Sequence, residues 1–374
     1  MITRLYVDNY RCLVNFECKL GAEQLILGPN GAGKSTIFDV LMALRDFSAL
    51  GLPGDDRFVG STRTRWQDIA EQRFELDVLS AHGTYMFKLI VDSWGNPQRP
   101  RILEESVTVD GKPVFRFNDG EVHLYNDQHQ AKVQYPFDWH RSALATITER
   151  RENTKLSWFK RWLTGILCIR PDPWRMSAIA ATEARWPMPT LSNFADWYRH
   201  LRQERGDDEH AEYVATMREV IEGFVGMRLE DAGDRRREIK VRMRTTHANG
   251  ERGREQEYLF EELSDGQRVL LGIYAVARFA MDGETTLCFD EPDNFVSLRE
   301  IDPWLQSVSE RAAETRSQVL LISHHPEFLN RMAFGQGLLF DRPDARHVRV
   351  RPFDDTAATG LSPAELVARG WERD

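Results

Sequence analysis

A run of small residues near the start of the chain has the composition of a phosphate-binding loop. Residues 28–35 read GPNGAGKS and fit the spacing G-x-x-x-x-G-K-[ST]. Such glycines let backbone N–H groups converge on phosphates, while the lysine reaches the β- and γ-phosphates and the serine hydroxyl ligates Mg²⁺. We therefore expect a nucleoside triphosphate with Mg²⁺ to contact seven consecutive residues: Asn30, Gly31, Ala32, Gly33, Lys34, Ser35 and Thr36.

The segments on either side of this loop predict the elements that would position it. The apolar residues 24–27 indicate a buried strand, and the run STIFDVLMALRDF that begins at Ser35 has the pattern of a helix. A strand, a loop and a helix N-terminus in this order are the context that the motif requires. An ordinary glycine-rich turn explains this combination poorly.

A second candidate is an acidic pair at the end of an apolar segment. The stretch TTLCFDE predicts a buried strand that ends in Asp290 and Glu291. In a nucleotide site, Asp290 would hold Mg²⁺ and Glu291 would orient or deprotonate the attacking water. Apolar residues followed by Asp-Glu are common, so an unremarkable strand end stays open as the alternative for this pair alone.

Two further motifs follow in order, LSDGQR at residues 263–268 and LLISHHPEF at residues 320–328. With them the chain resembles the ATP-binding cassette ATPases, whose signature loop reads LSGGQ and whose switch histidine follows a strand. Within that class it is most similar to the RecF/SMC-like, AAA-type ATPases of bacteria in their compact, nuclease-free form. The sequence pattern of that group appears in four stretches: VDNYRCLVNFECKLG, LGPNGAGKST, DEPDNF and SHHPEFL. The resemblance covers residues 1–145 and 255–345.

The resemblance implies a shared site. In cassette ATPases the signature loop of one subunit completes the nucleotide site of the other, so Ser264, Gly266 and Gln267 would face the γ-phosphate of ATP held on a partner's Lys34 loop. One copy of each motif then implies a homodimer with two ATP sites. His324 would sense the γ-phosphate beside Glu291, with His325, or neither histidine, as the alternative.

Other assignments from the resemblance are less direct. Tyr10 and Arg11 are expected near the adenine and phosphates, the alternative being a packed ring and a surface cation. Gln67 and Gln72 both qualify as the glutamine of the Q-loop. Asp265 stands where transport ATPases usually carry glycine, which disfavours a transporter subunit.

The fold class that we expect is α/β, a P-loop NTPase of the ATP-binding cassette type with a mixed central sheet, an antiparallel β subdomain and a helical insert. Residues 1–145 would form an N-terminal ATPase lobe that includes the antiparallel subdomain, where Asp110-Gly111 predicts a hairpin turn. Residues 146–254 would form a mainly helical insert, and residues 255–374 a C-terminal ATPase lobe.

Composition limits location and partners. The formal net charge is −9, the four cysteines show no paired spacing, and the longest apolar runs are too short to span a membrane. We expect a cytoplasmic protein with no membrane partner and with patchy DNA contact at most. Two basic stretches could supply such contact, residues 140–163 with Trp158, Phe159 and Trp162, and residues 235–244. Solvated charges and packed aromatic rings are the alternative.

These observations lead to a function hypothesis. We expect an ATPase that closes as a homodimer on ATP and drives or gates a DNA-linked process, in antiphage defence or DNA repair. Fewer than 50 residues follow Pro326, too few for the nuclease domain that some related ATPases carry. The resemblance to the compact, nuclease-free ATPases implies that a separate effector protein is involved. The alternatives are an ATP-gated scaffold for nucleic acid or effector with little turnover and, less favoured, a transporter ATPase subunit.

Overall fold

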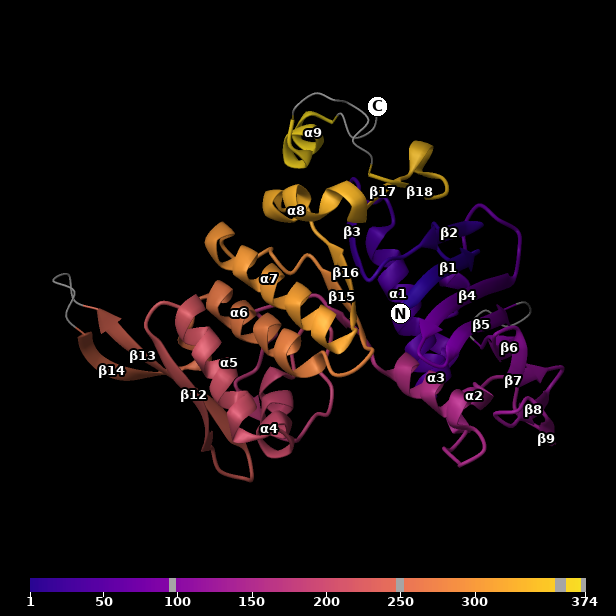
Figure 1. Ribbon diagram of the computed structural model, residues 1–374, viewed down its shortest axis with the longest axis horizontal. Coiled ribbons are helices and arrows are strands. Elements are labelled where there is room, and N and C mark those ends of the chain that lie inside the picture. Colours follow the sequence, from indigo (N-terminus) through magenta and orange to yellow (C-terminus); the bar gives the residue numbers. More distant parts are fainter. Residues whose placement is uncertain (94–98, 247–251, 354–360, 371–374) are drawn as a thin grey trace.

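A six-stranded mixed sheet forms the centre of the computed structural model, which describes residues 1–93, 99–246, 252–353 and 361–370 (Figure 1). Five strands run parallel and the last is antiparallel to its neighbour, in the order β10 (Ile166–Ile169), β15 (Thr286–Asp290), β16 (Gln318–Ile322), β3 (Glu23–Leu27), β17 (Gly337–Asp341) and β18 (Arg349–Pro352). Every residue of β15 and β16 is buried, as expected for a parallel sheet covered on both faces.

Helices cover the two faces of this sheet, and alternate residues of β3 divide between two cores. Ile26 belongs to the core that contains α1 (Lys34–Leu44), whereas Leu25 and Leu27 belong to the core that contains α6 (Asp265–Ala275), α7 (Leu298–Thr315) and α8 (Pro326–Gln336). Figure 1 shows α1 on one side of the central strands and α6 and α7 on the other. The expected mixed central sheet of a P-loop NTPase is therefore confirmed.

An eight-stranded antiparallel sheet packs beside α1. Its order is β2 (Phe16–Lys19), β1 (Ile2–Asp8), β4 (Glu71–Ser80), β5 (Gly83–Asp92), β6 (Arg101–Val109), β7 (Lys112–Asn118), β8 (Glu121–Tyr125) and β9 (Ala131–Pro136). Asp110 and Gly111 both have positive φ, 50° and 76°, at the turn between β6 and β7. The predicted antiparallel subdomain and its hairpin turn are thus present.

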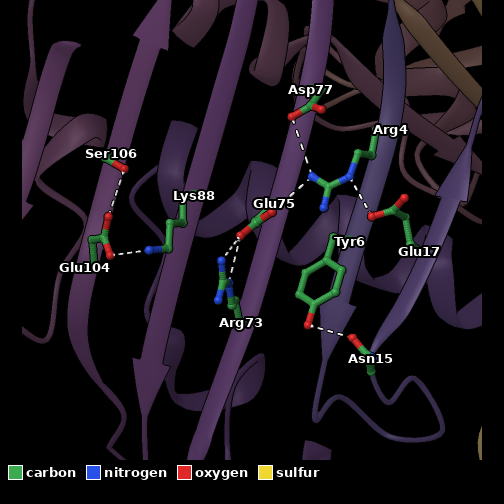
Figure 2. A network of polar contacts seen from close by, with 10 residues as sticks. All are labelled: Arg4, Tyr6, Asn15, Glu17, Arg73, Glu75, Asp77, Lys88, Glu104 and Ser106. Carbon is green, nitrogen blue, oxygen red and sulfur yellow. Dashed lines mark hydrogen bonds and ion pairs between the residues drawn. The ribbon is translucent and has the colours of Figure 1, made fainter. Parts of the chain in front are cut away.

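One face of this sheet carries a network of charged side chains (Figure 2). Arg4 on β1 donates to Glu17 at 2.8 Å and to Glu75 at 3.0 Å, so that one guanidinium joins three strands. Farther along the sheet, Lys88 pairs with Glu104 at 2.5 Å. Because the opposite face is apolar and buried, the alternation of polar and apolar residues in these strands fixes which side packs on α1.

The segment expected to be a helical insert holds both helices and strands. It contains α3 (Thr154–Thr164), α4 (Phe194–Glu204) and α5 (Asp207–Val220). It also contains strand β10 of the central sheet and most of a four-stranded sheet built from β11 (Ile179–Ala180), β12 (Phe224–Asp231), β13 (Arg237–Thr246) and β14 (Arg252–Leu259). The helical character is only partial, and the three boundaries stay a prediction.

The remaining α-helices are short: α2 (Ala143–Thr146) lies between β9 and α3, and α9 (Pro363–Arg369) lies near the C-terminus. None of the helices in the described ranges combines the length and the apolar composition that crossing a bilayer needs.

Candidate nucleotide-binding site

The glycine-rich loop connects β3 to α1, as its sequence predicts. Gly28, Gly31 and Gly33 all have positive φ, 137°, 80° and 92°. A Cβ on Gly28 would lie 2.1 Å from the carbonyl oxygen of Phe340 on β17. The first glycine is therefore required both by its backbone angle and by the close approach of a neighbouring strand.

Lys34, at the start of α1, lies within this loop. Its Nζ donates to the carbonyl oxygens of Gly28 at 2.7 Å and Pro29 at 3.1 Å. Burial lowers the pKa of Lys34, and the nearby carboxylates of Glu291 and Asp290 oppose that shift. The ammonium group is thus held in the loop with two carboxylates close by.

Ser35 and Asp290 meet at the edge of the central sheet. The Ser35 hydroxyl donates to Oδ1 of Asp290 at 3.2 Å, although the two residues are 255 positions apart. Asp290 is only 5% exposed, and this burial raises the pKa of its carboxyl group, against the hydrogen bond from Ser35 and the charge of Arg170. A carboxylate and a hydroxyl are oxygen ligands of the kind that Mg²⁺ prefers, so the donor set fits this ion.

Glu291 begins the loop after β15 in a left-handed conformation, with φ at 51°. Its backbone N–H donates to the carbonyl oxygen of Ile322 at 2.8 Å, and the Nδ2 of Asn294 donates to its Oε2 at 2.9 Å. An L-residue in this conformation is uncommon and is retained where surrounding structure enforces it. These contacts hold the carboxylate beside the phosphate-binding loop.

The two adjacent histidines differ in environment. Desolvation and the charge of Lys34 lower the pKa of His324, whereas Glu291 and Asp293 raise it, so its ring lies near these three groups. His325 instead accepts a hydrogen bond from the backbone N–H of Glu327 at 3.3 Å and caps α8. His325 is therefore engaged in the cap of α8, and the role of His324 as the switch residue stays a prediction.

A cavity of about 840 Å³ surrounds the phosphate-binding loop. Eight of the predicted residues line it: Arg11, Asn30, Gly31, Gly33, Lys34, Ser35, Thr36 and Glu291. Ala32 is instead buried in the core. The volume lies within the range of ordinary small-molecule sites.

Arg11 and Tyr10 have different surroundings. Arg11 lines the cavity, forms an ion pair with Asp39 and lies 5.4 Å from the centroid of the Tyr10 ring. Tyr10 is 2% exposed and packs edge-on against Phe74. The packed-ring alternative therefore holds for Tyr10, whose ring has no free face for a base.

Sequence reasoning missed several residues of this cavity, among them Trp66, Arg170 and Arg342. Arg170 directly follows β10, which pairs with β15 in parallel, so it lies beside the end of the strand that carries Asp290. The apolar run before Arg170 could have indicated this place at the sheet edge. The other two come from loops, and no spacing in the sequence relates them to the phosphate-binding motif.

The signature residues form the start of α6. Ser264 accepts a hydrogen bond from the backbone N–H of Gln267 at 3.2 Å, and the Gln267 side chain accepts one from the Ser264 N–H at 3.0 Å. This reciprocal pair is a capping box. A Cβ on Gly266 would lie 2.7 Å from the carbonyl oxygen of Phe295, so the loop after β15 packs closely there. None of these three signature residues lines the cavity around Lys34 of the same chain.

Neither candidate for the Q-loop glutamine lines the cavity. Gln72 is fully buried, and its Nε2 donates to the carbonyl oxygen of Asn9 at 3.0 Å. Gln67 is half-buried on the loop before β4. The amide of Gln72 is therefore committed to holding the segment around Asn9.

Parts of the two stretches considered for DNA contact are paired or packed. On β13, Arg242 and Arg244 both pair with Glu255 across the sheet, and Lys240 pairs with Glu238. In α3, Phe159 is fully buried and Trp162 is 5% exposed. These particular groups have protein partners, whereas DNA contact by the two stretches stays a prediction. Among the described residues, no group of three or more His, Cys, Asp or Glu could hold a metal ion.

Parts of this chain are similar to known proteins. A family model described as "AAA domain, putative AbiEii toxin, Type IV TA system" matches residues 192–330, a range that contains the signature, the Asp290-Glu291 pair and His324. An OLD nuclease from Thermus scotoductus is 46% identical over 55 residues, which span 13% of this chain and 10% of that nuclease.

Two solved structures that resemble this chain are SMC heads. A head bound to the C-winged helix domain of ScpA aligns with a TM-score of 0.54 at 11% identity, covering 95% of this chain and 99% of that one. The SMC head domain from Thermotoga maritima aligns with a TM-score of 0.47 at 11% identity, covering 94% and 99%. The first of these alignments shows that the chain has the fold of an SMC head.

Proposed function

We propose that the chain is an SMC/RecF-like P-loop ATPase of the ATP-binding cassette type, which binds ATP with Mg²⁺ and hydrolyses it. The observation that carries this proposal is the meeting of four groups from two segments at the phosphate-binding loop. Lys34 and Ser35 come from the start of α1, while Asp290 and Glu291 come from the end of β15. This set matches the recurring parts of phosphoryl-transfer sites.

Each residue has a separate task in this proposal. The backbone N–H groups of residues 30–36 and the ammonium of Lys34 hold the phosphates. Ser35 and Asp290 would hold Mg²⁺, which neutralises charge on the phosphate oxygens when it is bound. Glu291 accepts a proton from the attacking water, and His324 keeps that carboxylate and the γ-phosphate in line.

Replacement of Glu291 tests the hydrolysis step. We expect Glu291→Gln to lower turnover by about 10²- to 10⁴-fold while ATP still binds, because the amide keeps the shape of the side chain but cannot act as a base. Steady-state phosphate release and equilibrium ATP binding are the two measurements. Glu314→Gln, on the exposed end of α7, is the matched control. Turnover near the wild-type rate in Glu291→Gln would exclude this role.

The working unit in this proposal is a homodimer that closes on ATP. Ser264, Gly266 and Gln267 lie outside the cavity around Lys34 in their own chain, and Ser264 is exposed at the start of α6. A second copy could therefore present them to the γ-phosphate, with the positive end of the α6 dipole behind them. Each dimer would then hold two ATP molecules between the chains.

The biological role that we propose is to drive or gate a DNA-linked process through a separate effector protein, in antiphage defence or DNA repair. The match to an OLD nuclease and the family model whose description names a toxin support this direction. A pull-down of the Glu291→Gln form with ATP tests it. Recovery of a nuclease or toxin would support defence, DNA alone would support repair, and recovery of neither would contradict the role.

A scaffold that binds ATP with little turnover is the second candidate function. The packing of Ser264 and Gln267 into a capping box favours a preformed docking surface at the start of α6. Phosphate release with and without DNA separates the two candidates. Release that stays negligible in both conditions, with ATP bound, would favour the scaffold.

A further inference from the structure

An exposed aromatic ring stands at the mouth of the nucleotide cavity. Trp66 lies on the loop between the short helix Gly60–Thr62 and strand β4, and 46% of its surface is exposed. It lines the same cavity as Lys34, together with Ser61 and Arg65 from its own loop. Burial of a tryptophan ring normally stabilises the folded protein, and Trp66 lacks much of that burial. Its exposed ring surface is therefore available to a ligand in the cavity.

Arg342 holds one face of this ring. Its guanidinium carbon lies 5.5 Å from the centroid of the Trp66 ring, within the range of a cation–π contact. The same side chain donates to the carbonyl oxygen of Arg346 at 2.7 Å and approaches that of Gly31 at 3.5 Å. Arg342 therefore connects the ring to the phosphate-binding loop, which fixes the distance between the two.

No other aromatic side chain of the described residues lines this cavity. Tyr10, which the sequence places near the adenine, is packed against Phe74 with 2% of its surface exposed. A nucleotide whose phosphates lie at Lys34 consequently has one aromatic surface available to its base, and that surface is Trp66.

We propose that Trp66 is the platform on which the base of the bound nucleotide stacks, with Arg342 supporting the opposite face of the ring. This inference rests on the proposed ATP site. Stacking acts on the face of a base rather than on its hydrogen-bonding edge, so it favours large ring systems without reading their substituents. Trp66 therefore selects purine over pyrimidine nucleotides and discriminates little between ATP and GTP.

The test compares ATP with inorganic tripolyphosphate, which has the phosphates but no base. Truncation of a stacked aromatic side chain weakens binding by roughly 5- to 150-fold. We expect Trp66→Ala to lose affinity for ATP by a factor in this range and to keep its affinity for tripolyphosphate within about twofold. Trp66→Phe should retain most ATP affinity, because a smaller ring still stacks. Trp139→Ala, which removes a comparably exposed tryptophan outside the cavity, is the control.

The possible results distinguish a failure of the Trp66 stacking inference from a failure of the proposed ATP site. If wild-type protein binds neither ATP nor tripolyphosphate, the nucleotide site itself is wrong. If it binds ATP and Trp66→Ala binds ATP equally well, the platform is wrong while the site stands. Equal loss for ATP and tripolyphosphate would also overturn the platform, since the ring would then act on the phosphates. Should Trp66→Ala fail to fold, the affinities of wild type and Trp66→Phe for ATP and CTP decide, and equal affinity of wild type for both overturns the inference.

Discussion

The guanidinium of Arg170 lies 3.9 Å from Oδ2 of Asp290, while Oδ1 of the same carboxylate accepts the Ser35 hydroxyl. The Arg170 side chain is 64% exposed, whereas that of Asp290 is 6% exposed. An exposed cation that follows β10 thus lies on the solvent side of the carboxylate that we assign to Mg²⁺. Arg170 and Mg²⁺ would compete for the same negative charge.

Removal of this competition should ease metal binding. Exposed ion pairs contribute up to about 1 kcal/mol, so we expect Arg170→Ala to lower the Mg²⁺ concentration needed for half-maximal ADP binding by up to about fivefold. Titration of ADP binding with Mg²⁺ measures the midpoint, and ADP avoids any contact to the γ-phosphate. Arg175→Ala, on the same loop but paired with Asp172, is the control. An unchanged or higher midpoint would contradict the competition.

A mixing experiment tests whether each nucleotide site is shared between two chains. Lys34→Ala and Ser264→Arg should each be inactive alone. In a mixed dimer, the wild-type Lys34 loop of one chain meets the wild-type signature of the other, so one of the two sites is complete. Random mixing should restore about a quarter of wild-type phosphate release, since half of the dimers are mixed and each has one good site. Activity that stays absent after mixing and re-equilibration would mean that the site lies within one chain.

Replacement of the two adjacent histidines should have different effects, one on turnover and the other on the stability of the fold. We expect His324→Ala to lower turnover by at least about tenfold, because the ring lies near Lys34 and Glu291. His325→Ala should instead lose about 1 kcal/mol of stability with little effect on turnover, because it removes the cap of α8. Phosphate release and thermal unfolding of both variants are the measurements. The opposite pattern would move the switch role to His325.

A buried carboxyl group far from the nucleotide should make stability depend on pH. Glu105 on β6 is fully buried, and burial raises its pKa from 4.5 to about 7, against the hydrogen bond that it accepts from Ser142. The folded chain keeps a proton that the unfolded chain releases, so the free energy of unfolding falls as pH rises from 4.5 to about 7.

Glu105→Gln should abolish this decline, because the amide stays neutral at every pH. Urea midpoints at pH 5 and pH 8 measure it, and the difference between them should shrink in the variant. Glu104→Gln is a matched control on the other face of the same strand, where the carboxylate pairs with Lys88. A wild-type midpoint that is equal at both values of pH would rule out this role for Glu105.

The fold was predictable where spacing reports local geometry. The glycines of residues 28–33 and the turn at Asp110-Gly111 require positive φ, and the structure shows those angles. The alternation of polar and apolar residues near the N-terminus likewise corresponds to strands β1 and β2. The segment 146–254 was harder, because besides its helices α4 and α5 it holds the short strands β10 and β11, whose partners lie far away in sequence. Strand β10 is only four residues long and becomes a strand by pairing with β15.

The sequence by itself determined the phosphate-binding loop, the acidic pair, the signature and the switch histidines, because each is a short motif whose neighbours along the chain create its chemistry. Only the tertiary structure decided that His325 caps α8, that the ring of Tyr10 is packed, and that Trp66 and Arg170 line the cavity. The physical reason is that exposure and long-range proximity depend on how the two sheets enclose α1, and no spacing along the chain encodes that arrangement.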